Sequence, residues 1–580
     1  MGRRQLLSFL FCIVLTSAGS WAQEIGQQGG DVFVPAPGPP PVSMPSIDST
    51  NSHRADEEGV LRFKSQTVLV QVPVVVTDKS GNHVHSLSKD DFKILENGKQ
   101  QRISAFEEVM TSNAPATPTR TAPGTFSNLV LDAQQPRAVT LIALDTINTP
   151  FLDQAYGRKE LIKYLADHLE SGQVRGLVVI GSKGVKVLSG LNNDPPSLIA
   201  ALKKASGEVS PMQAFAAEGQ VLSASQAQPM QLTRGTMPGE DPAEKMRQFI
   251  VNADALEGAY QQSRAIEDTM KAFLAIAWSL SGIPGRKSLI WATGGFPFPL
   301  NSPASVPGGS LSLLYERAMD ALKDAQVSVY PVDVRGLVST GDVTYSGDSS
   351  ANNVPGASSL QNSTLDTLKT FAEMTGGRAY YNSNDLAAGF KRAAEDSTSY
   401  YLLGYYMNNQ NAKPGWRKLQ VEVQRKEMEV RARTGFFITN ATVDSDLTHK
   451  ADISFALSSP FDSTGIAVTV KWQGTSPDGA KKKVAFALHL PAVGIIDEAD
   501  KNRFDVDFIA QATLNGAPVG SAGQTTKGTI PAAGLAKIKA DGIFYQNALE
   551  LPPGSYDVRF VVRDNLKGRI GSVTAPITVN

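Results

Sequence analysis

Four nearly continuous apolar runs constrain the fold of this chain more than any other feature. They are AVTLIALD, GLVVIGS, KSLIWATGG and VSVYPVDV, and all lie within residues 138–334. Strands that are covered on both faces of a sheet have such uninterrupted apolar sequences. Between the runs, residues 152–170 and 242–281 carry apolar side chains at spacings of three and four, which predicts helices. Alternating strands and helices predict a doubly wound α/β domain with a mostly parallel sheet.

We assign residues 137–398 to this α/β domain. The segment GVKVLSGL predicts a short strand at the edge of its sheet. Two polar segments, residues 207–240 and 337–361, interrupt the pattern and are predicted to be inserted loops. Two further helices are predicted at about residues 362–376 and 385–398.

The N-terminal segment, residues 1–22, has the features of an export signal. Arg3 and Arg4 precede the short apolar run LLSFLFCIVL, and Ser20-Trp21-Ala22 is a small-x-small cleavage site. The sequence therefore predicts a periplasmic or extracellular protein. The one cysteine of the chain, Cys12, lies within this signal, so the mature chain is expected to have neither a disulfide nor a cysteine-ligated metal.

The mature chain begins with a predicted tether. Residues 23–58 are rich in Gly, Pro, Ser and Gln, which favours an extended or disordered segment. We expect no transmembrane segment elsewhere, because no other run approaches the roughly 20 apolar residues that a span requires. The formal net charge of −1 gives no bulk attraction to nucleic acid, so no nucleic-acid partner is expected.

Two further regions are predicted to be β-structure. In residues 59–110, TVLVQVPVVVTD alternates as a half-buried strand does, and Asn97-Gly98 marks a tight hairpin. Residues 399–437 contain the strand-like runs SYYLLGYYM, RKLQVEVQR and MEVRART. One hypothesis is that these later strands complete the sheet begun by residues 59–110, so that the α/β domain is inserted into a β-domain. The alternative is a separate hairpin on the α/β domain.

The remaining segments divide into a linker and a second all-β region. Residues 111–136 are rich in Pro, Thr and Ala and are predicted to be a linker. Residues 445–580 are predicted to be a β-sandwich, because alternating runs such as KVAFALHL and YDVRFVVRD are separated by turns. Tyr556, directly after the turn in LPPGSY, resembles the tyrosine corner of immunoglobulin-like sandwiches.

The α/β segment resembles a von Willebrand factor type A domain. The order of motifs from about residue 64 to 437 is similar to that of exported bacterial VWFA-related domain proteins. The resemblance rests on VPVVVTDKSGNHVHSLSKDDFKILENGKQQRISAFE, LIALDTINTPFLDQAYGRKELIKYL, GRKSLIWATGGFPF, VYPVDVRGL, MTGGRAYYN, SYYLLGYY and VRARTGFF. It implies a multidomain α/β plus all-β protein whose ligand-facing loops lie at the carboxyl ends of the parallel strands, where open α/β sheets bind.

The resemblance also implies a divalent cation on Asp-x-Ser-x-Ser after the first strand, with a Thr and a later Asp in Thr-Asp-Gly. Asp145 matches the first Asp and Thr149 the second Ser, but Ile147 stands at the first Ser position and Gly294 at the later Asp position. The distant Thr has candidates only in Thr233 and Thr236. Hard cations need several oxygen ligands. We therefore predict no metal or other cofactor; Asp145 and Thr149 are the candidates if Mg²⁺ or Ca²⁺ binds.

Other polar groups are weighed in the same way. Asp333, in YPVDVRG, either joins Asp145 as a carboxylate pair or orders its own loop beside Arg335, which we favour. DKSGN, at residues 78–82, begins like a calcium loop but is better explained as a hairpin turn. His83 and His85 are spaced as metal ligands on one strand face, yet no third ligand is evident.

The leading functional hypothesis is a non-enzymatic, adhesion-type binding protein. Its α/β domain would present strand-end loops to a protein partner, with Asp145, Asn148, Thr149 and Thr293 forming the partner-binding rim. One alternative is a hydrolase that uses Asp145 and Asp333 as general acid and base. The other is a purely structural component of the cell envelope.

Overall fold

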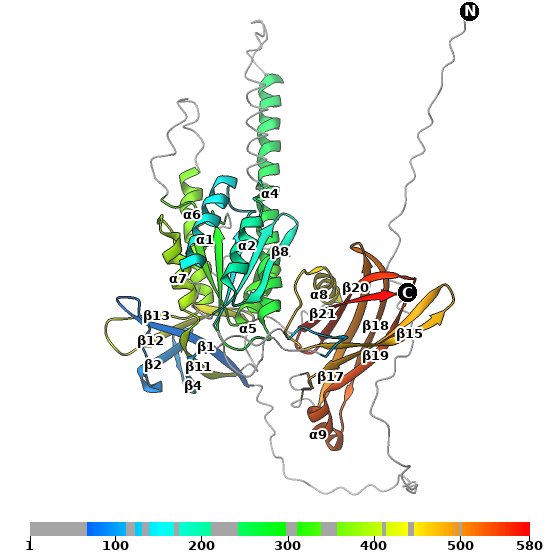
Figure 1. The fold of residues 1–580 in the computed structure, drawn as a ribbon. Helices are drawn as coiled ribbons and strands as arrows, with labels where there is room; N and C mark the ends of the chain where they lie inside the picture. Colours follow the sequence, from blue (N-terminus) through cyan, green and yellow to red (C-terminus); the bar gives the residue numbers. More distant parts are fainter. Residues whose placement is uncertain are drawn as a thin grey trace, which may run out of the picture.

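The computed structural model describes residues 67–111, 122–129, 138–167, 173–209, 242–296, 310–337, 357–408, 413–438, 446–492, 495–497 and 502–580. The predicted signal 1–22, the tether 23–58 and most of the two predicted insertions lie outside these residues. The described strands form five sheets of mixed α/β and all-β character (Figure 1). Among the described residues, no helix combines the length and the apolar composition that a membrane-crossing helix needs.

The central sheet has the strand order β10-β9-β6-β7-β8. Its first four strands are parallel and β8 is an antiparallel edge strand, as GVKVLSGL predicted. Helices cover both faces: Ile142 packs into the core of α1, α2 and α7, while Leu141 and Ala143 pack into the core of α4, α5 and α6. The apolar runs are continuous because both faces are buried. The strands are β6 (Val139–Asp145), β7 (Val174–Gly181), β8 (Gly184–Asn192), β9 (Lys287–Thr293) and β10 (Val327–Asp333).

Six helices accompany this sheet in the described part of the chain, of which α2 and α5 were not predicted. The prediction of helix over 242–281 corresponds to a single helix of 39 residues, α4, which extends beyond the neighbouring helices (Figure 1). The predicted loop 337–361 is wrong at its end, because α6 already begins at Ala357. The helices are α1 (Phe151–Asp167), α2 (Pro195–Lys204), α4 (Pro242–Leu280), α5 (Ser310–Asp324), α6 (Ala357–Thr375) and α7 (Leu386–Glu395).

The strands before and after the α/β region belong to one β-domain. β1 pairs with both β11 and β13, and β2 pairs with β12, so residues 67–110 and 399–438 share two sheets and one apolar core. They do not form a separate hairpin. The tight turn between β2 and β3 has positive φ angles at Asn97 and Gly98, as the Asn-Gly signal predicted. The strands are β1 (Thr67–Asp78), β2 (Phe92–Glu96), β3 (Lys99–Gln101), β4 (Ile103–Met110), β11 (Ser399–Asn408), β12 (Gly415–Val423), β13 (Met428–Arg431) and β14 (Gly435–Ile438), and a short 3₁₀ helix, η1, covers Lys89–Asp91.

The C-terminal region has two antiparallel sheets, β19-β16-β15-β5 and β18-β17-β20-β21, across a shared core. The Tyr556 hydroxyl donates to the Pro552 carbonyl at 2.8 Å, four residues upstream. The prediction that residues 445–580 contain only strands is wrong, because two helices, α8 (Asp446–Ser458) and α9 (Ala532–Asp541), lie among them. The strands are β15 (Thr469–Asp478), β16 (Lys481–Leu490), β17 (Arg503–Leu514), β18 (Ala517–Thr529), β19 (Ile543–Leu551), β20 (Gly554–Asp564) and β21 (Arg569–Val579).

Part of the predicted linker 111–136 is structural. β5 (Thr125–Ser127) pairs with β15 at the edge of the C-terminal sheet, although the whole α/β domain lies between them in the sequence. The buried Asn128 side chain fixes this strand with three bonds: it donates to the carbonyls of Ser463 and Ile466 at 2.7 and 2.8 Å and accepts from the Val468 amide at 2.8 Å. The segment between the β-domain and the α/β domain therefore completes the C-terminal sandwich.

Asn128→Ala is expected to destabilise the docking of β5 by about 2–3 kcal/mol, because it leaves a buried N–H and two buried carbonyls without these partners. The measurement is native-state hydrogen exchange of the β15 amides. Thr125→Ala is the matched control, since it changes the same strand and keeps the Asn128 amide. Equal exchange in the two variants would contradict the role given to Asn128.

Helix α8 joins the α/β domain to the sandwich. Asp452, which is buried, accepts from Arg317 on α5 and from Arg563 on β20, the latter at 3.1 Å. Phe455 packs edge-on against Trp278 of α4 with ring centroids 5.4 Å apart. One helix thus supplies both a charged and an aromatic contact across the boundary between the two domains.

Lys287 is buried at the start of β9, where its ammonium donates to the Ile283 carbonyl at 2.6 Å. Burial lowers the pKa of Lys287 to about 7, whereas an unfolded chain leaves a lysine near its ordinary value of about 10.4. Between these pH values the unfolded chain binds more protons than the folded one. Stability is therefore expected to rise with pH across this window, by up to about 1.4 kcal/mol per unit.

Lys287→Met is expected to remove that slope, because methionine fills the site without titrating. The measurement is the difference in the urea midpoint of the α/β domain between pH 7 and pH 9, for variant and unaltered protein. Lys271→Met is the control, since the Lys271 side chain is 44% exposed and pairs with Glu267 on the surface. A slope that persists in Lys287→Met would show that other groups produce it.

Candidate functional site

Asp145 lies where the sheet reverses its winding direction. It is the last residue of β6, which leads to α1 on one face, while neighbouring β9 is followed along the chain by α5 on the other face. Open α/β sheets bind ligands at this place. Thr293 ends β9 and Asp333 ends β10, in register with each other, so Asp145, Thr293 and Asp333 stand in one row across three strands.

The Asp145 carboxylate accepts five hydrogen bonds. Oδ1 accepts from the backbone amides of Ile147 and Asn148, each at 3.0 Å. Oδ2 accepts from Asn148 Nδ2 at 2.8 Å, from the Trp291 indole at 3.0 Å and from the Thr293 hydroxyl at 2.8 Å. Both oxygens are thereby committed to donors from β9 and from the loop after β6. Asp145 holds the two strand ends together.

The neighbouring polar groups extend this network. Thr149 Oγ1 accepts from the Gly294 amide at 2.8 Å, which ties the same two loops a second time. Asn148 Nδ2 donates to the Thr269 hydroxyl of α4 at 3.0 Å. Sequence reasoning missed Thr269 and Trp291, while Thr233 and Thr236, the predicted candidates for a distant Thr, lie outside the described residues.

Three of the four predicted rim residues are buried. The exposed fractions of Asp145, Thr149 and Thr293 are 2%, 1% and 0%, and only Asn148 is half-buried. Burial raises the pKa of the Asp145 carboxyl, and the hydrogen bonds from Asn148, Thr293 and Trp291 oppose that rise. The four residues lie together, as predicted. The three buried ones, however, support the loops from inside the domain and do not offer contact atoms to a partner.

The cation that the family resemblance implies does not fit these residues. Both oxygens of Asp145 face hydrogen-bond donors, and Ile147 has no side-chain oxygen. A side chain at Gly294 has no room, because its Cβ would lie 2.9 Å from Pro150 Cδ and 3.1 Å from the Asn148 carbonyl oxygen. The missing aspartate of Thr-Asp-Gly is therefore excluded at this position by the packing of the adjacent loop.

Asp333 belongs to a separate ion pair. Its oxygens accept from Arg335 Nε at 2.9 Å and Nη2 at 2.7 Å, and its carboxylate is fully buried. Two strand spacings separate β10 from β6, about 10 Å between backbones. General acid–base catalysis needs carboxylates within reach of a substrate. The bidentate arginine commits Asp333 to ordering its own loop, the alternative that the sequence favoured.

The two other metal candidates have structural partners. Asp78 accepts from the amides of Ser80 and Asn82, which makes DKSGN a hairpin turn. His83 Nε2 lies 3.9 Å from Asp396, whereas His85 Nδ1 lies 3.0 Å from Glu108. The two histidines face different carboxylates, and no group of three His, Cys, Asp or Glu in the described residues is arranged to hold a metal ion.

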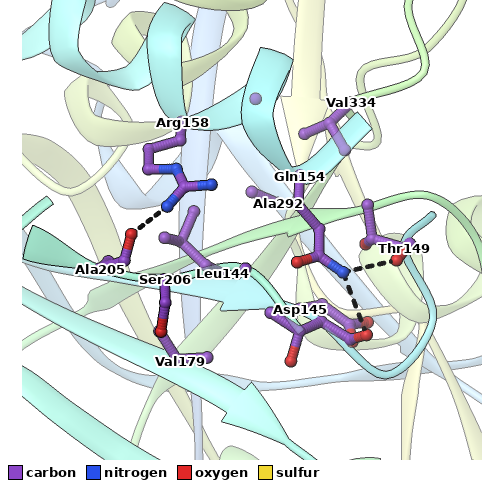
Figure 2. Close-up of a pocket in the computed structure, with 13 residues that line it drawn as sticks. Leu144, Asp145, Thr149, Gln154, Arg158, Val179, Ala205, Ser206, Ala292 and Val334 are labelled. Carbon is purple, nitrogen blue, oxygen red and sulfur yellow. Dashed lines mark hydrogen bonds between the residues drawn. The ribbon is translucent and has the colours of Figure 1, made fainter. Parts of the chain in front are cut away.

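A small crevice lies beside Asp145, between α1, the ends of β6 and β7, and residues 205–207 (Figure 2). Gln154 and Arg158 reach into it from α1, and Figure 2 shows Arg158 bonded to the Ala205 carbonyl. The free volume within the crevice is about 20 Å³, which accommodates about one water molecule. The crevice is therefore filled almost completely by side chains and by the segment that follows α2.

Large apolar side chains are exposed around this edge of the sheet. Phe151 and Leu152, at the start of α1, are 44% and 78% exposed, and Leu337, in the loop after β10, is 65% exposed. Tyr156, one turn after Leu152, donates to the Asn384 carbonyl, and Asn384 accepts from the Leu337 amide. Helix α1 is thus linked through Asn384 to the loop after β10, close to three exposed apolar side chains that we call the apolar crown: Phe151, Leu152 and Leu337.

No family model and no curated protein matches the chain. Among solved structures, it is similar to proximal thread matrix protein 1 from the mussel byssus, in crystal form 2, at 13% sequence identity. That match covers 45% of this chain and 48% of the mussel chain, with a TM-score of 0.21. The chain thus spans about half the length of the solved structure that it matches, and the likeness is too slight to decide fold or function.

Proposed function

We propose that this chain is an exported, non-enzymatic binding protein whose von Willebrand factor type A-like domain contacts a protein partner through its strand-end loops. The apolar crown is the observation that carries the proposal, because it exposes Phe151, Leu152 and Leu337 at the edge where open α/β sheets bind. Large contiguous apolar patches on protein surfaces mark interaction sites. The buried network around Asp145 keeps the underlying loops rigid, which lowers the entropy lost on binding.

The same arrangement favours binding over hydrolysis. Asp145 accepts five hydrogen bonds and Asp333 is paired with Arg335, so neither carboxylate is poised to exchange a proton with a substrate. Export is supported by the signal-like segment 1–22. The hydrogen bond from Tyr556 to Pro552 supports an immunoglobulin-like assignment for the C-terminal sandwich, which would act as a spacer or a further contact surface.

The test is capture of a partner from the native envelope by the full mature chain. Leu152→Asp is expected to abolish capture, because it places a charge on the most exposed side chain of the apolar crown. Leu514→Asp, at a 38% exposed leucine of the sandwich, is the matched control and should capture normally. Equal capture by both variants would overturn the proposal in favour of a structural role, and hydrolytic turnover lost in Asp333→Asn would overturn it in favour of an enzyme.

A further inference from the structure

The segment that follows α2 lines the crevice, and its first residue, Ala205, has an extended backbone. Gln154, which is 8% exposed, uses both ends of its amide on one residue: Nε2 donates to the Glu208 carbonyl at 2.7 Å, and Oε1 accepts from the Glu208 amide at 3.0 Å. Arg158 donates to the Ala205 carbonyl (Figure 2). These contacts hold the backbone of residues 205–208 and do not depend on their side chains.

The Glu208 carboxylate occupies a niche at the ends of β6 and β7. One oxygen accepts from the Thr146 hydroxyl at 3.3 Å, and the other accepts from the Ser182 hydroxyl. Gly181 forms the floor, where an added Cβ would lie 2.8 Å from Glu208 Oε2. The single proton of the Thr146 hydroxyl is shared with the Ile180 carbonyl at 3.0 Å, so this hydroxyl keeps an acceptor if the carboxylate leaves.

Gly207 fits closely against side chains in the wall of the crevice. A Cβ at this position would lie 2.8 Å from Phe151 Cε2 and 3.1 Å from Gln154 Oε1. Phe151 belongs to the apolar crown, so the bound segment passes directly beside the proposed partner surface. The crevice therefore selects three features: an extended backbone, a glycine, and a carboxylate on the following residue.

We propose that this crevice is a docking site for an extended partner segment with glycine followed by an acidic residue, and that Ser206-Gly207-Glu208 occupies it in cis. The inference rests on the proposed function and names the chemistry of the partner. The internal segment is held mainly by polar, local contacts, which an incoming segment of the same chemistry replaces bond for bond. Occupation in cis lowers the apparent affinity for a partner by the fraction of time that the crevice is open.

The test uses a fluorescent Ala-Ser-Gly-Glu-Val peptide and the full mature chain. The double variant Gly207→Val, Glu208→Ala should expel the internal segment and bind the peptide at least about tenfold more tightly than the unaltered protein. Peptides with glutamine in place of glutamate, or valine in place of glycine, should not bind the double variant. The inference would be overturned if the double variant and the unaltered protein bound the peptide with equal affinity. It would also be overturned if the double variant bound the glutamine peptide as tightly as the glutamate peptide.

A second measurement needs no variant. Excess peptide should speed hydrogen exchange at the Glu208 amide of the unaltered protein, because it displaces that amide from Gln154; unchanged exchange at saturating peptide would overturn displacement. If the peptide does not bind but Leu152→Asp still abolishes partner capture, only this inference is overturned. If the peptide binds but Leu152→Asp captures the partner normally, the proposed function is overturned and the docking site still stands.

Discussion

Replacing Asp145 by alanine is expected to destabilise the α/β domain by about 3–5 kcal/mol. The substitution removes the common acceptor of five donors. The Trp291 indole and the amides of Ile147 and Asn148 lose this acceptor, whereas the Thr293 hydroxyl keeps the Gly295 carbonyl at 2.8 Å. Each buried donor without a partner costs about 1–3 kcal/mol, and local relaxation keeps the total below the sum. Asp145→Asn should destabilise the domain less than Asp145→Ala, because asparagine keeps one acceptor oxygen. It should still destabilise the domain, because its amide nitrogen then faces the donors that bonded to the other oxygen.

Native-state hydrogen exchange of the β6 amides is the measurement, since a protein with several domains has no single free energy of unfolding. Asp167→Ala is the control, because it removes an exposed carboxylate from the end of the helix that follows the same loop. A loss below about 1 kcal/mol in Asp145→Ala would show that the donors find other partners. It would also contradict the structural role that we assign to the Asp145 carboxylate.

The second large effect is expected at the junction between the α/β domain and the β-domain. Arg431 of β13 donates from Nη2 and Nε to the two oxygens of Asp396, at 2.6 and 3.1 Å, and the Tyr330 hydroxyl donates to the same carboxylate at 2.9 Å. Arg286 in turn donates to the Tyr330 oxygen at 2.8 Å. Arg431→Met leaves a buried carboxylate without its cation, which costs about 3–5 kcal/mol.

The matched control is Arg378→Met. Arg378 pairs with Glu429 at 2.7 Å, but both side chains are about half exposed, at 42% and 51%. Exposed ion pairs contribute about 0–1 kcal/mol. The measurement is native-state hydrogen exchange of the β10 and β13 amides in the full mature chain, in which Arg431→Met should lose clearly more protection than Arg378→Met. Equal losses of protection would contradict a buried junction at Asp396.

The sequence predicted the parts of the fold that depend on local pattern. The apolar runs of β6, β7, β9 and β10 are continuous because each strand is buried on both faces, and Asn97-Gly98 adopts the positive φ angles of its hairpin. Long-range pairing was less predictable. The pairing of β1 with β11 was one of two alternatives, because pairing between strands that lie so far apart in the chain leaves no local pattern in the sequence.

Short elements in polar surroundings escaped sequence reasoning. β5 covers only Thr125–Ser127 within a Pro/Thr/Ala-rich segment, and its anchor, Asn128, has the composition of a loop residue. In α8, the apolar residues Ile453, Phe455 and Leu457 alternate along the sequence as those of a strand do, so this helix did not stand out from the strands that follow it.

The candidate site was predicted in its location but not in its exposure. Asp145, Asn148, Thr149 and Thr293 come together because the ends of neighbouring parallel strands meet at one edge of a sheet. Burial of the carboxylate depends on Trp291, whose indole was counted only as an apolar strand residue although it also donates a hydrogen bond. Glu208 gave no signal, because its contacts arise from the path of the chain after α2.

Calorimetric titration of the purified mature protein with Mg²⁺, Mn²⁺ and Ca²⁺ tests the central claim most directly. If the hydrogen bonds at Asp145 organise the strand-end loops in place of a cation, none of the three ions should bind in the micromolar range. Micromolar binding of any of them to the unaltered protein, abolished in Asp145→Asn, would contradict the account.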